Sequence, residues 1–170
     1  MPATASAPPF PPVVVGAVRA AAEDFFTTSC KLGLTPSPDP QAAGGAAIMG
    51  VMSFFGDPVW SFALILPEPV AVAAALGFAG FDIPFDSPDM GDMVGEMANV
   101  MAGDIVARLE RARVKAQMSL PTVTRGHDVE LLPPSHAQEV RAYFSSPAGG
   151  VQIRLFQALV SAPAGFHPHG

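Results

Sequence analysis

Glu96 and Asn99, a carboxylate and an amide three residues apart, lie on the polar side of a predicted helix. Asn99 is the only asparagine in the chain, at a mid-helix position where asparagine is a poor helix former because its side chain competes for backbone hydrogen bonds. Gly103, one turn later, leaves the same face without a side chain, so a partner could approach closely. This row of residues indicates a surface that docks a partner and takes part in a reaction. The alternative is a solvated helix face, the usual role of exposed Glu and Asn.

The helix that carries this row is predicted over 87–115 by its hydrophobic period of about 100° per residue. Ser87 is expected to cap it, with Pro88 at the first helical position and Asp89 in the first turn. The apolar arc holds Val94, Met97, Ala98, Met101, Ala102, Ile105 and Leu109. The opposite, narrower arc holds Asp92, Glu96, Asn99, Gly103, Ala107 and Glu110.

The segments before this helix combine helical and extended patterns. The expected elements are a helix over 10–34, a loop over 35–45, strands over 47–55 and 59–66, a short helix over 69–75 and an apolar connector over 78–86. Gly56-Asp57-Pro58 between two apolar runs is typical of a hairpin turn. Gly77 is expected to close the short helix.

After the central helix, apolar residues recur at every second position, which indicates strands. The expected strands are 118–124, 127–131, 140–144 and 151–159, the first two forming a hairpin around Arg125-Gly126. In the last strand Gln152 and Arg154 alternate with apolar residues, which predicts one wet face. The sum is an α+β fold: a mainly antiparallel sheet of about six strands packed against the long central helix and the N-terminal helix.

The 170 residues are enough for one domain with a substantial core. We place this domain at 13–162, after a disordered, proline-rich lead-in at 1–12 and before a C-terminal tail at 163–170. The lead-in lacks the positive start of a secretory signal. These features predict a cytoplasmic protein.

Composition argues against several classes of protein. The mean hydropathy is +0.35, but the charge-free piece 59–66, between the breaks at 56–58 and 67–69, is far shorter than the roughly 20 residues of a membrane-spanning helix. A net charge of −6 without a basic stripe argues against nucleic acid as a partner. Cys30 is the only cysteine, which excludes a disulfide framework and a cysteine zinc site, and the four histidines lack zinc spacing.

The run Asp92-x3-Glu96-x2-Asn99, followed after 21 residues by Pro121, resembles the signature of the CheC/CheX/FliY phosphatases of bacterial chemotaxis. Residues 95–103 are similar to the helix motif of that family, and 119–126 are similar to the strand and turn that follow it. The pattern resembles CheX most closely, from the first helix to the last strand. CheC proteins carry two such sites and CheX one, and a chain with a single asparagine has room for only one.

This resemblance implies a CheX-like fold, a homodimer formed by joining sheets edge to edge, and a phosphatase that acts on the aspartyl phosphate of a CheY-like response regulator. It implies no cofactor in this chain, because the regulator supplies Mg²⁺. Asn99 would orient the attacking water and Glu96 would pair with a lysine of the regulator. Asp92 and Gly103 are expected on the partner-binding surface, where Asp92 caps the helix or supports Glu96 and Gly103 clears space.

Two functions of different classes follow. The first is the response-regulator phosphatase, favoured because both Glu96 and Asn99 are intact. The second is a non-catalytic CheX-like module that binds a receiver domain or dimerises within a signalling assembly, since membership of a family does not prove turnover.

Overall fold

A computed structural model describes residues 10–38 and 44–157 of the chain. Within these ranges the chain forms three helices and seven strands. In order they are α1 (Pro12–Thr28), β1 (Thr35–Ser37), β2 (Ala46–Gly56), β3 (Trp60–Pro67), α2 (Glu68–Ala79), α3 (Pro88–Arg111), β4 (Ala116–Met118), β5 (Thr122–His127), β6 (Gln138–Ser146) and β7 (Gly149–Gln157). The predicted C-terminal tail, 163–170, lies outside the described residues, as do residues 1–9 of the lead-in.

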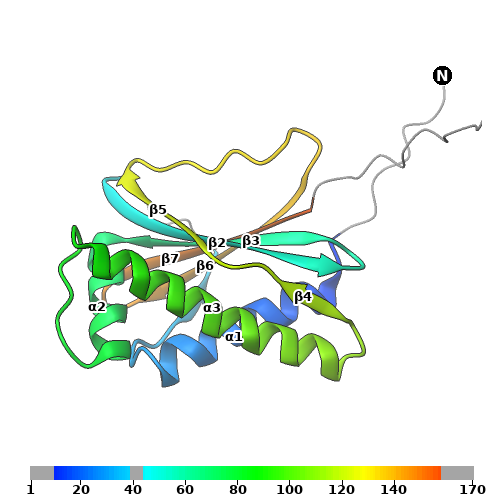
Figure 1. The fold of residues 1–170 in the computed structure, drawn as a ribbon, viewed down its shortest axis with the longest axis horizontal. Coiled ribbons are helices and arrows are strands. Elements are labelled where there is room, and N and C mark those ends of the chain that lie inside the picture. Colours follow the sequence, from blue (N-terminus) through cyan, green and yellow to red (C-terminus); the bar gives the residue numbers. More distant parts are fainter. Residues whose placement is uncertain (1–9, 39–43, 158–170) are drawn as a thin grey trace, which may run out of the picture.

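The seven described strands join in one antiparallel sheet in the order β1-β6-β7-β3-β2-β4, and β5 also pairs with β2. The three helices cover one face of this sheet (Figure 1). A single large apolar cluster fills the space between the helices and the sheet. The predicted α+β fold is confirmed, with a slightly different strand count.

The two predicted pairs of long strands are confirmed. β2 and β3 pair from Ala47↔Pro67 to Phe54↔Trp60, with a cis Asp57–Pro58 peptide in the turn between them. β6 and β7 pair in the same antiparallel way around a two-residue turn at 147–148. The inward residues of these strands are almost all apolar and buried, as expected for a sheet with one face on the core.

The second predicted hairpin, 118–124 with 127–131, is wrong. β5 runs straight through the predicted turn at Arg125-Gly126 and pairs with β2 over six residue pairs, while 128–131 form part of a loop. The free edge of β2 pairs with the backbone groups on one side of the whole segment, and this pairing outweighs the local turn preference of glycine.

The first two helices differ from their predicted bounds. α1 ends at Thr28 instead of reaching residue 34, and β1 occupies the start of the predicted 35–45 loop by pairing with β6. α2 extends past the predicted 69–75 and ends at Gly80, which has the left-handed φ of +83°. Gly77 lies inside α2 because the backbone of Cys30 passes there: a Cβ at Gly77 would overlap the Cys30 carbonyl oxygen.

The central helix α3 follows the prediction closely. Ser87 caps it, its Oγ accepting a hydrogen bond from the Met90 backbone N–H at 3.3 Å. All seven residues of the predicted apolar arc are buried. Near the C-terminal end, Arg108 donates to Asp104 at 2.9 Å and to Asp24 of α1, so α3 is fixed to α1 by an ion pair as well as by apolar contacts.

Residues 128–137 cross the face of the sheet that the helices leave open (Figure 1). The start of this crossing segment is fixed where Gly45 N–H donates to Asp128 Oδ1 and Asp128 N–H donates to the Gly45 carbonyl, both at 2.9 Å. Val129 and Leu131 then pack against a small cluster on the sheet, made of Met49, Ala63 and Ile65. The second face of the sheet is therefore partly covered.

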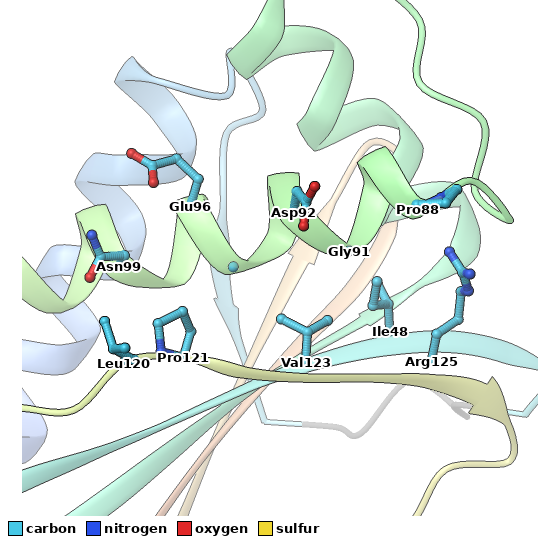
Figure 2. A pocket seen from close by; sticks show the side chains of 11 residues that line it. Ile48, Pro88, Gly91, Asp92, Glu96, Asn99, Leu120, Pro121, Val123 and Arg125 are labelled. Carbon is cyan, nitrogen blue, oxygen red and sulfur yellow. The ribbon is translucent and has the colours of Figure 1, made fainter.

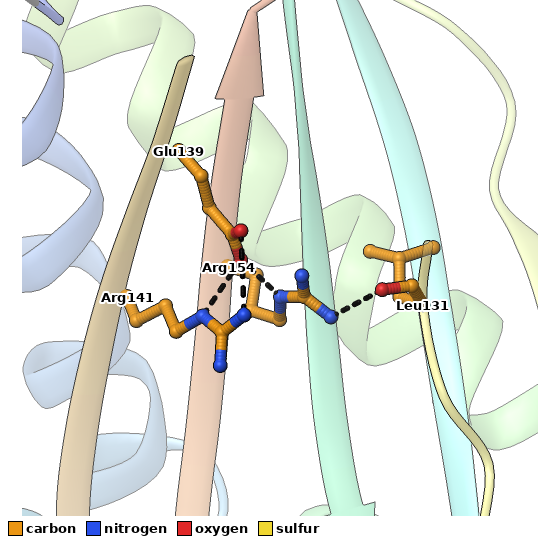
Figure 3. A network of polar contacts seen from close by, with 4 residues as sticks. All are labelled: Leu131, Glu139, Arg141 and Arg154. Carbon is orange, nitrogen blue, oxygen red and sulfur yellow. Dashed lines mark hydrogen bonds and ion pairs between the residues drawn. The ribbon is translucent and has the colours of Figure 1, made fainter. Parts of the chain in front are cut away.

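The predicted wet face of β7 is wrong at Arg154, which is only 6% exposed because the crossing segment covers it. Its guanidinium donates from Nε to Glu139 Oε1 and from Nη1 to the Leu131 carbonyl oxygen at 2.6 Å (Figure 3). Arg141 Nε donates to the same Glu139 oxygen at 2.9 Å. The buried charge thus ties the crossing segment to β6 and β7.

Replacing Glu139 by glutamine should lower the free energy of unfolding at neutral pH by about 2 kcal/mol, because Arg154 would lose its charged partner. Burial raises the pKa of Glu139, but the hydrogen bonds from Arg154 and Arg141 outweigh it and the net pKa is lowered. A lowered pKa contributes stability above the unfolded value near 4.5, and this contribution is lost as the pH falls through the folded pKa.

Chemical denaturation of the wild type and the Glu139→Gln variant from pH 7 to pH 3 measures this effect. The two free energies of unfolding should converge as the pH falls. The Glu23→Gln variant, which changes a carboxylate of α1 that forms no ion pair with the residues that the structure describes, serves as the control. A constant difference between the wild type and Glu139→Gln across this range would show that the Glu139 charge contributes no pH-dependent stability.

The packed part of the chain begins earlier than the predicted boundary at residue 13. Phe10 is buried, and its ring meets Trp60 edge to face with a centroid distance of 6.2 Å. Pro12 is already the first residue of α1. Within the predicted lead-in, Phe10 therefore packs on the domain and Pro12 belongs to its first helix.

Candidate active site

Asp92, Glu96 and Asn99 lie in a row along α3 and line one wall of an open groove of about 760 Å³ (Figure 2). Asp92 and Glu96 are exposed and Asn99 is half-buried. The row stands on the side of α3 that faces away from the core, because the buried apolar arc fixes the rotation of the helix. The helix therefore presents a carboxylate and an amide to the same space.

The opposite wall of the groove comes from β5 and the residues just before it, chiefly Leu120, Pro121 and Val123. Figure 2 shows these side chains facing the polar row across the groove. Gly95 of α3 lies directly beside this wall: a Cβ there would be in ordinary van der Waals contact with Pro121 Cγ and Val123 Cγ2, both at 3.6 Å. Pro121 and Val123 therefore line the strand side of the groove close to the helix backbone.

Arg125 of β5 holds the beginning of α3. Its Nη1 donates to the carbonyl oxygens of Phe85 and Ser87, both at 2.7 Å, and its guanidinium carbon lies 5.9 Å from the centre of the Phe85 ring. Ser87 is also the helix cap. Arg125 therefore fixes the start of α3, and with it the register of the polar row, relative to the sheet.

Three of the four predicted site residues meet in this groove, and Gly103 does not line it. A Cβ added at Gly103 would meet nothing within 4 Å, so the helix surface is open there. The role of Gly103 in partner binding stays a prediction.

Arg125 and Leu120 line the groove but were not assigned to the site from the sequence. A signal for Arg125 existed: Val123 and Arg125 share one face of a strand, and a cation beside an inward apolar residue requires a partner. The carbonyl partners come from a connector about forty positions away in sequence, and no local pattern indicates such a pair.

Cys30 is a core residue. Its side chain is buried, with Sγ 3.8 Å from Met97 Sδ, and burial raises the pKa of its thiol to about 12. Such a thiol is protonated at neutral pH and is a poor nucleophile. In 10–38 and 44–157, no group of three His, Cys, Asp or Glu side chains is arranged to hold a metal ion, and His167 and His169 lie outside these ranges.

The fold is shared with CheC-like and CheX chemotaxis proteins of known structure. It is similar to a CheC-like superfamily protein from Shewanella sp. PV-4, with a TM-score of 0.78, 18% identity and coverage of 88% of this chain and 100% of that one. It is also similar to the chemotaxis protein CheX from Vibrio vulnificus, with a TM-score of 0.75, 23% identity and coverage of 85% and 96%.

A third similar structure is the CheX-CheY-BeF3-Mg²⁺ complex from Borrelia burgdorferi, with a TM-score of 0.62, 16% identity and coverage of 85% and 94%. The family model for the chemotaxis phosphatase CheX matches residues 48–145, more than half of the chain, with the whole polar row inside the match. The chain therefore belongs to the CheX family. No curated protein matches it, and no described helix is both long and apolar enough to span a membrane.

Proposed function

We propose that this protein hydrolyses the aspartyl phosphate of a CheY-like response regulator, with Asn99 and Glu96 entering the regulator's active site from α3. The observation that carries the proposal is the shared groove: the motif's carboxylate and amide lie one turn apart on the same open wall. Membership of the CheX family supports it, and the Borrelia burgdorferi structure is a complex of CheX with CheY.

Asn99 would orient the water that attacks phosphorus. An amide suits this role because it donates and accepts hydrogen bonds at the same time and carries no charge to repel the phosphoryl group. Placing one water in line with the bond that breaks lowers the barrier without a covalent intermediate on this chain. The glutamine of GTPases positions water in a comparable way.

Glu96 would fix the helix in the regulator's active site by accepting a charge-assisted hydrogen bond from a lysine of the regulator. Its exposed carboxylate has no ion pair among the described contacts, so the acceptor is available. Asp92, one turn earlier on the same wall, adds a second negative charge facing the same lysine. The Mg²⁺ that neutralises the phosphoryl oxygens would belong to the regulator, and this chain would need no cofactor of its own.

Replacing Glu96 by alanine should raise KM for the phosphorylated regulator about tenfold and also lower kcat, because one charge-assisted hydrogen bond that sets the register is lost. Release of inorganic phosphate at several regulator concentrations measures both constants. Glu110→Ala, which removes an exposed carboxylate near the far end of α3, is the matched control. Equal constants for Glu96→Ala and Glu110→Ala would contradict the role of Glu96.

The competing function is a CheX-like module that binds a receiver domain, or dimerises, without turnover. If a regulator binds the wild type but loses its phosphoryl group no faster than it does alone, the result would favour this module. The homodimer implied by the resemblance stays a prediction: in the described part of the sheet, β1 forms one edge and β4 with β5 forms the other, and either could join two copies.

A further inference from the structure

We propose that two exposed apolar side chains, Leu120 and Phe81, are the anchors that seat the response regulator on either side of the Glu96–Asn99 row. This inference rests on the proposed function and adds the residues that determine binding of the partner. Their exposed fractions are 85% for Leu120 and 62% for Phe81. Isolated exposed apolar residues are normal, but here two large ones flank the same polar row, which is typical of an interaction site.

Leu120 is directed outward by a bulge in the sheet edge. Val51 of β2 is opposite Thr122, and Phe54 of β2 is opposite Met118. Between these pairs, two residues of β2 face three residues, 119–121, so the edge carries one extra residue. A bulge of this kind redirects a side chain and is common beside active sites.

The backbone at the bulge is held in place. Ser119 N–H donates to the Ser53 carbonyl at 2.8 Å, and Ser53 N–H donates to Ser119 Oγ at 2.9 Å. Ser119 Oγ also donates to the Leu120 carbonyl at 2.9 Å, and Pro121 packs beside Gly95 of α3. The exposed leucine is thus presented on a fixed support, at the end of the groove nearest Asn99 (Figure 2).

Phe81 occupies the other side of the row. It lies on the connector between α2 and α3 and lines a second hollow of about 360 Å³, together with Ile83 and Met93. This hollow and the groove share Asp92 and Glu96. The polar row is therefore the ridge between two hollows, and each hollow has an exposed apolar side chain on its rim.

The charge of this surface favours a response regulator over a second copy of this chain as the binding partner. Three carboxylates, those of Asp89, Asp92 and Glu96, line the two hollows against one cation, Arg125, whose guanidinium is bonded to backbone carbonyls at the start of α3, so the surface is negative on balance. A second copy of this chain docked through the same face would bring these carboxylates against one another, which is unfavourable. A partner that inserts a lysine beside Glu96 complements them. A receiver domain that contacts Glu96 would meet the rims of both hollows, because Glu96 lines each of them.

The test compares two anchor variants with two matched controls. Leu120→Ser and Phe81→Ser remove the anchors. Leu132→Ser, on the crossing segment at 77% exposure, and Phe55→Ser, at the end of β2 at 52% exposure, remove equally apolar side chains outside both hollows. Thermal melting first checks that all four proteins fold, as expected for exposed positions.

Each variant is titrated with the CheY-like regulators of its source organism, activated with BeF3⁻ and Mg²⁺ for binding and labelled with ³²P for turnover. Each anchor variant should bind about tenfold more weakly than the wild type, and the loss should appear in KM rather than in kcat. The two controls should bind like the wild type. Equal binding by anchor and control variants would overturn the proposal.

These readouts separate the anchors from the proposed function. If the wild type binds a regulator without speeding its dephosphorylation, the phosphatase proposal fails, while weaker binding by Leu120→Ser and Phe81→Ser alone still supports the anchors. If the wild type dephosphorylates a regulator and the anchor variants share its KM, the anchors fail and the phosphatase stands. Absence of binding to every regulator overturns both.

Discussion

Replacing Asn99 by alanine should lower kcat for dephosphorylation of the regulator by at least about 100-fold, the usual cost of removing one positioned polar group from a reacting centre. The amide is half-buried on the groove wall, beside the exposed Glu96 and opposite Leu120. Alanine removes the donor and the acceptor that would hold the attacking water, and it keeps the helix because alanine is the best helix former.

Binding separates this effect from a loss of docking. The affinity of Asn99→Ala for a BeF3⁻-activated regulator should stay within about threefold of the wild type, because Glu96 and the groove are unchanged. Gln117→Ala, which removes an exposed amide from β4, is the control for loss of an amide elsewhere. Full turnover by Asn99→Ala would rule out the water-positioning role.

Replacing Gly77 by alanine should lower the free energy of unfolding by at least about 3 kcal/mol, the upper range for overpacking. A Cβ at this position would overlap the carbonyl oxygen of Cys30. Backbone cannot move aside as the end of a flexible side chain can, so α2 would have to shift away from the segment that follows α1. Urea denaturation followed by far-ultraviolet circular dichroism measures the change.

Gly16→Ala is the matched control, because Gly16 also lies inside a helix but a Cβ there would meet nothing within 4 Å. That substitution should raise the free energy of unfolding by about 0.5 to 1 kcal/mol, the difference in helix propensity between glycine and alanine. The two substitutions are chemically identical and should act with opposite sign. A stabilised Gly77→Ala protein would contradict the close packing of α2 against Cys30.

The sequence was most informative where local pattern and tertiary burial agree. The apolar arc of α3 is continuous over about four turns and the helix has a cap at Ser87, so both the helix and its rotation could be predicted. The rotation in turn predicted that Asp92, Glu96 and Asn99 would share an open face. The pairs β2–β3 and β6–β7 were predictable because a strong turn separates two strands that are adjacent in sequence.

The sequence was least informative where the deciding contact is distant. Residues 127–131 alternate like a strand, but the free edge of β2 pairs with β5, which ends at His127, and residues 128–131 begin the segment that crosses the sheet. Arg154 alternates with apolar residues like a solvent-facing position, and it is buried because the crossing segment covers it. Gly77 resembles a helix end until the passage of Cys30 is known.

In the candidate site, too, the residues on one element could be predicted, and those placed by distant contacts could not. The residues that would do the chemistry lie on one helix and could be predicted from their spacing, whereas Arg125, Leu120 and Phe81 line the same hollows from other elements. The bulge that exposes Leu120 depends on the register of β4 and β5 against β2. Such register is set by pairing over long sequence separations, which a local pattern does not encode.

The decay of a ³²P-labelled CheY-like regulator in Mg²⁺ directly tests whether this protein removes the phosphoryl group of a response regulator. Decay should be faster with the wild type than with the regulator alone, and should proceed at the unassisted rate with Asn99→Ala. Unchanged decay with the wild type, under conditions where it binds the regulator, would rule out phosphatase activity and identify a non-catalytic binding module.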